Sequence, residues 1–397
     1  MGIFLINICY FSQPAVLFDF PVLIGDTGSA DANIAAWFFT KLYVEGSMYG
    51  LFSILFGASA LLILDTVKMS GIHGIAVVDR YYRRMLWLIL FGLVHAYLLL
   101  SPMEILFSYG VLGLFLFPLR NLKPVSLVIA GTVMVLLGAV DFVFITSASA
   151  DELIGSIDGQ ISHASEIMQA FAQELTLYHS NYRDIFVANQ ELAASWQTIN
   201  LFEDHVYDAG GMMLIGMGLY KTGLLTGKMS LRFYLLLAVV CYLSAVAIRL
   251  PELLVLYNSG FSPVVYQEMS THFSLLARPL LSLGHIGFLL ALYHSRIISD
   301  LFGGLAAAGR MALTNYVLQS VFSISLFYGF GFSLYGELER YQLLMIGLLF
   351  GCVQIIYSLV WLRYFRFGPL EWLWRLLVAM KAQPFMRQII AEPKTTS

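Results

Sequence analysis

Two ionisable side chains, His95 and Glu104, lie at the facing ends of neighbouring apolar segments. Charged groups in such segments are costly, and they usually face a cavity or a partner. Ser101-Pro102 between the segments makes a tight hairpin, so the two side chains could approach each other. A neutral histidine beside a carboxylate can act as a general base, and we take His95 and Glu104 as the candidate catalytic pair. In the alternative interpretation, His95 bonds a backbone carbonyl and Glu104 lies among external head groups.

A second group of residues is a candidate for binding substrate. His205 and Asp208 lie one helical turn apart, and Gly210 and Gly211 after them permit close approach of another backbone. We interpret the pair as part of an external pocket, or alternatively as a helix start where the dipole favours an acid. Arg278 lies deep in an apolar segment, where an arginine usually pairs with an acid or binds an anion. Its candidate acidic partners are Glu45, Glu104, Asp208 and Glu268.

Arg310, Asn315 and Gln319 form a third candidate group, also for substrate binding. Asn315 and Gln319 share one helix face because they are four residues apart. Arg310 begins this helix after a glycine-rich entry, and a helix N-terminus could receive the phosphate of a donor such as acyl-CoA. The alternative is a ladder of interhelical hydrogen bonds, each worth about 1 kcal/mol.

The sequence predicts no metal site and no tightly bound cofactor. The three cysteines are isolated and lack C-x-x-C spacing, which argues against a zinc site or a redox pair. His272, His285 and His294 share no helix face with acidic residues. No G-x-S-x-G nucleophile motif is present.

The elements that must position these residues are membrane-spanning helices. Of the 397 residues, 12% are charged and 59% are hydrophobic, whereas about 25% of the residues in a soluble domain are charged. This composition excludes a disordered chain, a nucleic-acid-binding protein and an ordinary cytosolic enzyme. Because about 20 apolar residues cross a bilayer, we predict an all-α polytopic bundle of about ten transmembrane helices. The predicted spans are 1–12, 44–64, 85–100, 103–119, 125–147, 206–222, 233–250, 273–295, 309–330 and 342–362.

The distribution of basic residues predicts the orientation of the bundle. With the N-terminus inside and the spans alternating, 17 of the 22 Lys and Arg residues fall in cytoplasmic segments. The positive-inside rule therefore predicts that both termini are cytoplasmic. In this topology the first two candidate groups lie in the outer half of the membrane, and the third lies on the cytoplasmic approach.

Two segments are predicted to be helical without crossing the membrane. In residues 148–204, apolar residues from Ile154 to Ile185 recur at three- and four-residue steps, so we expect an external amphipathic helix, continuous or broken. A coiled-coil dimer seam is the alternative. Residues 365–397 are expected to form a cytoplasmic interfacial helix and a tail. We otherwise treat residues 1–397 as a single membrane domain, and the sequence leaves its oligomeric state open.

Several blocks of sequence carry a resemblance to a known family. They are LFSILFG at 51–57, GLVHA at 92–96, GMGLYKTGL at 216–224, GRMALTNYVLQS at 309–320 and GPLEWLWR at 368–375. In this order they resemble the domain-of-unknown-function 418 family, also called YeiB-like. The likeness covers nearly the whole chain, and its C-terminal block spans about residues 205–385.

The resemblance implies a protein of the bacterial inner membrane that is similar to the wider set of transmembrane acyltransferases. It would move an acyl or acetyl group from a cytoplasmic donor, such as acyl-CoA, to a lipid or glycan acceptor at the outer side. Membrane lipids are its expected partners, and nucleic acid is not. Two other functions fit the same residues. A small-molecule or lipid transporter or flippase suits polar groups at several depths, and a non-catalytic membrane scaffold suits the external amphipathic helix.

The chain departs from the family pattern in three places. The family usually opens with an Arg, an Asp and an Arg-Gly pair before the first helix, whereas this chain begins with Met1-Gly2-Ile3. We therefore expect the natural reading frame to extend upstream of Met1 by about half a span. The usual Asp before Ile-Leu is Glu104 here. Acyltransferase-3 enzymes also carry a catalytic His near the first helix, but no His precedes His73, so their catalytic apparatus does not transfer.

The predicted topology can be tested with a single introduced cysteine. A cysteine placed after Ser149 is expected to react with a membrane-impermeant thiol reagent added outside intact cells, because residues 148–204 are predicted to be external. Gel-shift labelling before and after permeabilisation measures this. Labelling that requires an opened inner membrane would contradict the topology.

Overall fold

The computed structural model describes residues 2–387 apart from 20–29, 70, 72, 155–156, 262–264, 266–271 and 298. Helices form the described part of the chain, in which one β-bridge joins Phe365 to Met386. The predicted all-α fold is confirmed. Met1 and the tail after Arg387 lie outside the described residues.

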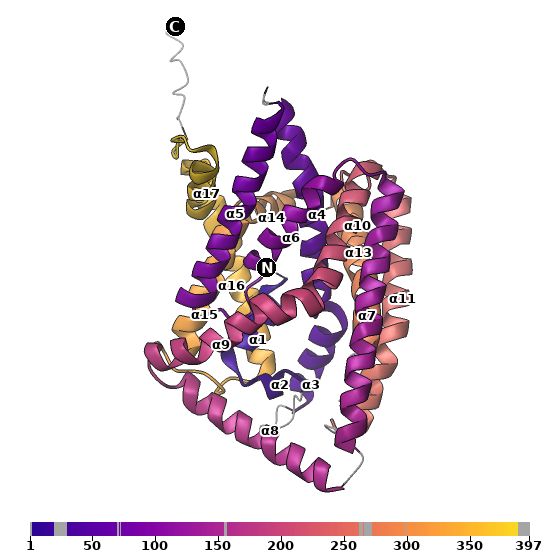
Figure 1. Ribbon diagram of the computed structural model, residues 1–397, viewed down its shortest axis with the longest axis vertical. Coiled ribbons are helices and arrows are strands. Elements are labelled where there is room, and N and C mark those ends of the chain that lie inside the picture. The colour runs from indigo at the N-terminus through magenta and orange to yellow at the C-terminus, as the bar shows by residue number, and fades with distance from the viewer. Residues whose placement is uncertain are drawn as a thin grey trace.

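Each predicted span contains a helix (Figure 1). The first part of the chain forms α1 (Phe4–Ser12), α2 (Ala15–Asp19), α3 (Ala30–Phe39), η1 (Thr40–Val44), α4 (Ser47–Met69), α5 (Ile75–Leu98), α6 (Leu106–Leu119), α7 (Pro124–Ile154), α8 (Ile157–Tyr178), α9 (Tyr182–Asn200) and η2 (Leu201–Gly210). The rest forms α10 (Gly211–Thr222), α11 (Leu231–Asn258), α13 (His272–Ser295), α14 (Ser299–Arg310), α15 (Ala312–Phe327), α16 (Arg340–Tyr364) and α17 (Pro369–Ala379).

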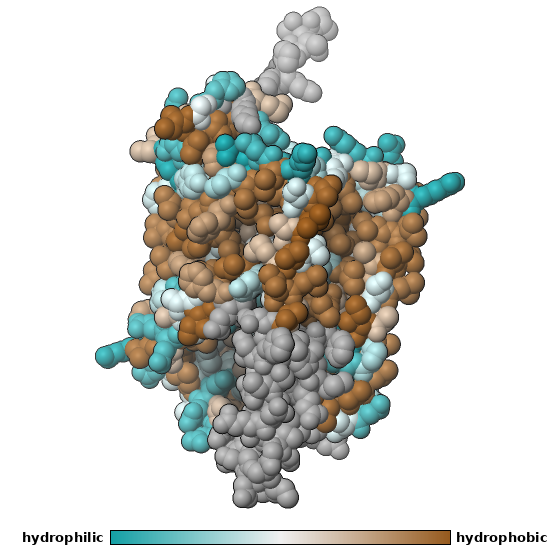
Figure 2. Space-filling view, turned by 45° about the vertical axis from the view of Figure 1, so that its right-hand side comes forward, coloured by the Kyte–Doolittle hydropathy of each residue, from teal (hydrophilic) through white to brown (hydrophobic). Residues whose placement is uncertain are grey.

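The apolar helices give the bundle the surface of a membrane protein. Four helical stretches of the described residues are long and apolar enough to cross a membrane: Asp31–Val67, Leu231–Asn258, Leu275–Ser295 and Arg340–Tyr364. Large apolar side chains such as Leu236 and Leu243 on α11 lie exposed on the outside. Figure 2 shows hydrophobic residues across the middle of one face, with hydrophilic residues toward its upper and lower ends. Because a water-soluble monomer rarely exposes so much apolar surface, these helices are suited to contact lipid.

The predicted external segment is a broken helix. Helix α8 lies across the end of the bundle opposite to α17 (Figure 1), and α9 turns back and packs against α5. The break occurs before Asn181, whose side chain caps α9 by accepting the backbone N–H of Asp184 at 3.1 Å. Helix α8 is joined to α2 by Glu174, which accepts the N–H of Ala15 at 2.8 Å. Burial raises the pKa of this carboxyl above its usual value.

Helix α17 joins the two most specific sequence blocks. The Glu371 carboxylate accepts the backbone N–H of Thr314 at 3.0 Å and its hydroxyl at 2.6 Å, and so caps the start of α15. The Arg84 guanidinium lies 3.7 Å from the ring centroid of Trp374, which holds α17 against α5. The predicted non-spanning helix of residues 365–397 is therefore present as α17, packed on two helices of the bundle.

Several pairs of helices pack through glycines with no side chain between their backbones, among them α4 with α10 and α11 with α13. A Cβ added at Gly57 of α4 would overlap the carbonyl oxygen of Met213, and one added at Gly216 of α10 would overlap that of Ile54. A similar contact joins α11 to α13, where a Cβ on Gly287 would lie 2.9 Å from the backbone nitrogen of Ala238. Small residues allow this close helix packing in membrane proteins.

The α4–α10 contact predicts a large effect of one substitution. Gly216→Val should lower the free energy of unfolding by about 1–3 kcal/mol or more, because the added atoms overlap backbone that cannot yield cheaply. The thermal unfolding midpoint in detergent measures the loss. Gly303→Val on α14 is the matched control, since a Cβ there meets no described atom within 4 Å. Equal midpoint shifts for the two variants would contradict the contact.

Candidate functional site

An internal cavity of about 350 Å³ lies among α1, η1, η2, α11 and α13. Ligand pockets in proteins begin at roughly this size, about 300 Å³. Its lining includes His205, Asp208 and Arg278, three of the residues expected to bind substrate. The sequence therefore identified one side of this cavity.

Both π-helical segments of the described chain contribute to the cavity wall. Segment η1 supplies Lys41, and segment η2 supplies His205 and Asp208. Fewer than about 1% of residues in globular proteins are π-helical, and such turns are frequent at functional sites. At η1, the hydroxyl of Thr40 bonds the carbonyls of Ala36 and Trp37 at 2.9 and 3.0 Å, so a side chain competes with the regular helical ladder at this junction.

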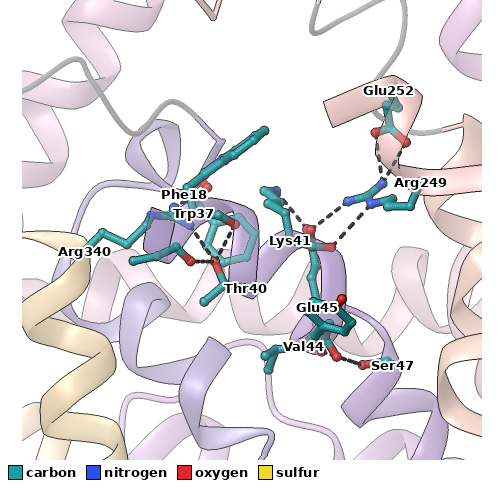
Figure 3. Close-up of polar contacts among 12 residues, drawn as sticks. Phe18, Trp37, Thr40, Lys41, Val44, Glu45, Ser47, Arg249, Glu252 and Arg340 are labelled. Carbon is teal, nitrogen blue, oxygen red and sulfur yellow. Dashed lines mark hydrogen bonds and ion pairs between the residues drawn. The ribbon is translucent and has the colours of Figure 1, made fainter. Parts of the chain in front are cut away.

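A row of four alternating charges lines the cavity beside η1 (Figure 3). Lys41 Nζ lies 2.9 Å from Glu45 Oε1, and Arg249 Nη2 lies 2.9 Å from Glu45 Oε2. Arg249 Nη1 also holds both oxygens of Glu252, at 2.9 and 3.0 Å. Each cation thus has a carboxylate partner, which buried charge requires. We call these four residues the charge row.

The second charged group is the ion pair between Arg278 of α13 and Asp208 of η2, formed through Arg278 Nη1. Arg278 lies directly against the backbone at Gly46, where any Cβ would overlap its Nε. Gly46 has a φ of +69°, a conformation that glycine adopts readily. Because Gly46 has no side chain, Arg278 can lie next to the charge row, and Glu45 of this row directly precedes Gly46 in the chain.

His205 is the histidine of the cavity wall. It is 4% exposed and lies edge-on to the ring of Trp196, with centroids 4.9 Å apart. Its Nδ1 is buried without a hydrogen-bond partner among the described residues. Since buried polar atoms are usually hydrogen-bonded, this nitrogen lacks a bond that a buried imidazole usually makes.

The candidate catalytic pair lies behind the cavity wall. His95 Nδ1 is 3.6 Å from Glu104 Oε1, near but beyond hydrogen-bond distance, and His95 Nε2 bonds the hydroxyl of Ser320 at 2.8 Å. The Glu104 carboxylate accepts the backbone N–H groups of Leu106 and Phe107, which caps the start of α6. Neither His95 nor Glu104 is part of the cavity lining, although Met103 and Ile105 are. Glu104 is therefore next in the chain to two lining residues, but neither member of the pair is itself part of the lining.

The third candidate group divides into two parts. Asn315 bonds Ser358, and Gln319 bonds Gln354 at 2.8 Å, so both amides join α15 to α16. This geometry is the interhelical ladder of the alternative interpretation. Arg310 is exposed at the end of α14 and does not line the cavity.

Sequence reasoning missed most of the charge row. The sequence indicates Glu45 as a candidate acidic partner of Arg278, but it does not single out Lys41, Arg249 or Glu252. The available signal was spacing: Lys41 and Glu45 are four residues apart, and Arg249 and Glu252 are three apart, so each pair shares a helix face within an apolar segment. Among the described residues, no cluster of three His, Cys, Asp or Glu could hold a metal ion.

The Arg278–Asp208 pair predicts a stability effect. Asp208→Asn should cost about 3 kcal/mol of unfolding free energy, because it leaves a mostly buried guanidinium without its charge partner. Asp79→Asn is the matched control, since Asp79 is 54% exposed against 14% for Asp208, and its pair with Arg83 should contribute less than about 1 kcal/mol. Chemical unfolding in detergent compares the two. A loss at Asp208 no larger than that at Asp79 would refute the buried role.

Comparison with known proteins finds the same family that the sequence blocks resemble. Residues 219–381 match the family described as "Protein of unknown function (DUF418)". The chain is 29% identical to "Uncharacterized protein YeiB" of Escherichia coli (strain K12), over 97% of this chain and 94% of that protein. It is 25% identical to "Uncharacterized protein YxaH" of Bacillus subtilis (strain 168), over 98% and 93%. No solved structure matches. Residues 219–381 are thus similar to the DUF418 family, and nearly the whole chain is similar to YeiB.

Proposed function

We propose that this protein is a membrane acyltransferase whose acceptor binds in the charged cavity, with His205 as the general base. The observation that carries the proposal is the His205 imidazole, which lines a cavity that also holds an Arg–Asp pair and whose buried Nδ1 has no hydrogen-bond partner among the described residues. A general base must lie within hydrogen-bond reach of the proton it takes, and a ligand in this cavity would meet that condition. His205 replaces His95 as the proposed base because His95 does not line the cavity.

The proposed reaction uses an acceptor hydroxyl and a thioester donor. The hydroxyl oxygen attacks the acyl carbonyl carbon while His205 takes the hydroxyl proton. The new C–O bond forms and the thioester C–S bond breaks. The protonated imidazole then returns the proton to the leaving thiolate, so the products are an ester and a free thiol. Arg278, which uses one terminal nitrogen on Asp208, has further N–H donors with which to hold negative charge on the acceptor.

The other candidate residues take supporting roles in this proposal. The donor is an acyl-CoA that approaches from the cytoplasm, and exposed Arg310 adds positive charge near its phosphates. Asn315 and Gln319 hold α15 and α16 together. The His95–Glu104 pair positions the start of α6, whose neighbouring residues line the cavity. The acceptor is a lipid or glycan at the outer side of a bacterial inner membrane, with both termini cytoplasmic.

The test is transfer of label from acetyl-CoA by the purified full chain in lipid nanodiscs, supplied with lipid and glycan acceptors. His205→Gln should lower the transfer rate about 100-fold or more, because general-base catalysis contributes about that much. His73→Gln is the matched control, since His73 is exposed away from the cavity and should leave the rate unchanged. His95→Gln should have a smaller effect than His205→Gln.

Three outcomes would overturn the proposal. The first is absence of transfer with every acceptor. The second is full activity in His205→Gln. The third is uptake of a labelled solute into proteoliposomes without any transfer, which would identify the chain as a transporter instead.

A further inference from the structure

The charges around the cavity balance each other. The lining holds three cations, Lys41, Arg249 and Arg278, and three carboxylates, Glu45, Glu252 and Asp208. Each cation lies against at least one of these carboxylates. Among the described residues of the lining, these six groups therefore sum to no formal net charge, unlike those of a simple anion-binding pocket.

The six groups differ in how accessible they are. The side chains of Glu252, Lys41 and Arg249 are 1%, 4% and 5% exposed, so they are closed off by their partners. Glu45 is 24% exposed and Arg278 is 21% exposed. Asp208 is 14% exposed. A ligand in the cavity would therefore meet Glu45 as the most accessible carboxylate and Arg278 as the most accessible guanidinium, and Arg278 lies against Gly46, the residue after Glu45.

This pairing selects the charge of the ligand. A ligand with a net charge would leave that charge uncompensated in a largely buried site, and burial of an uncompensated charge is strongly unfavourable. A ligand with one positive and one negative group adds no net charge and can engage both accessible side chains. A neutral polyol would engage neither of them with an ionic bond.

We propose that the cavity binds a zwitterionic head group, its anionic oxygens on Arg278 and its primary ammonium against Glu45. The ligand class is an organic phosphodiester or carboxylate that bears a primary amine, together with a free hydroxyl as the group that the proposed reaction acylates. A volume of about 350 Å³ suits such a head group or a small solute of the same chemistry. This inference names the acceptor class of the proposed transferase and rests on that function for its chemical consequence, but the binding itself needs no acyl donor.

Binding is tested first on the unaltered protein. The full chain, delipidated in detergent, is titrated calorimetrically with glycerophosphoethanolamine, with its N-acetyl derivative and with glycerol. The zwitterion should bind at least tenfold more tightly than the N-acetyl derivative, which lacks the ammonium, and glycerol should not bind. Equal binding of the first two compounds, or equal binding of glycerol, overturns the proposal without any mutation.

Variants then assign the two contacts. Glu45→Gln should remove the preference for the zwitterion over its N-acetyl derivative, and Arg278→Gln should weaken both at least tenfold. Glu337→Gln and Arg232→Gln are matched controls at exposed positions outside the cavity, and they should leave binding unchanged. Unfolding midpoints report whether each variant is folded. If Glu45→Gln does not fold, the ligand comparison on the unaltered chain still decides. A preference unchanged in folded Glu45→Gln refutes the ammonium contact.

Two further arms separate the sources of the ligand and the two proposals. Nanodiscs that contain lysophosphatidylethanolamine, whose glycerol keeps a free hydroxyl, should compete with the soluble probe if the ligand is a lipid, and nanodiscs that contain only phosphatidylglycerol should not. Absence of competition by either assigns the same chemistry to a soluble solute. Tight zwitterion binding without acyl transfer would overturn the transferase and keep this inference. Transfer to acceptors that lack an ammonium, at an equal rate, would do the reverse.

Discussion

Pairing of buried charge across helices is the constraint on which this architecture depends. Arg249 holds Glu45 and Glu252 at once, and thereby ties α11 to the junction between η1 and α4. Arg278 ties α13 to η2 through Asp208. In an apolar bundle neither arginine could remain without its carboxylate, since removing one partner leaves an uncompensated charge. The helices must therefore meet where these groups meet, and the space left between them is the cavity.

The helices themselves could be predicted because a helix suited to contact lipid needs a nearly continuous run of apolar residues. The run from Leu231 to Asn258 is long and apolar enough to cross a membrane by itself, and its helix is found where the hydropathy indicates. The π-helical segments could not be predicted, because they come from one-residue shifts in hydrogen bonding that apolar periodicity does not record. The extent of α5 shows the same limit: it begins at Ile75, before the predicted span, since its charged first turns continue the helix outside the apolar run.

The candidate site was predictable where a charged residue stands out from an apolar segment. Arg278 and Asp208 were expected in one pocket and form an ion pair there, with His205 in the same wall. His95 and Glu104 were expected to approach each other, and they do. Whether they line the cavity depends on the direction of α6 after its cap, which the sequence does not show. Lys41 does not stand out in the sequence, because a lysine near the end of a span is typical of a loop. Only the fold shows that it is 4% exposed and bonded to Glu45.

The glycine contacts have a mechanical consequence. Helices α4 and α10 touch through their backbones, and so do α11 and α13, so each pair must move as one stiff body. Polar contacts join the first helix pair to the second. They are Arg249 to Glu45, Arg278 to Asp208 beside α10, and the hydroxyl of Ser282 to the carbonyl of Ser47. A zwitterionic ligand that bonds Arg278 and Glu45 competes for the atoms that join the two helix pairs, so occupancy of the cavity and the separation of these pairs are coupled.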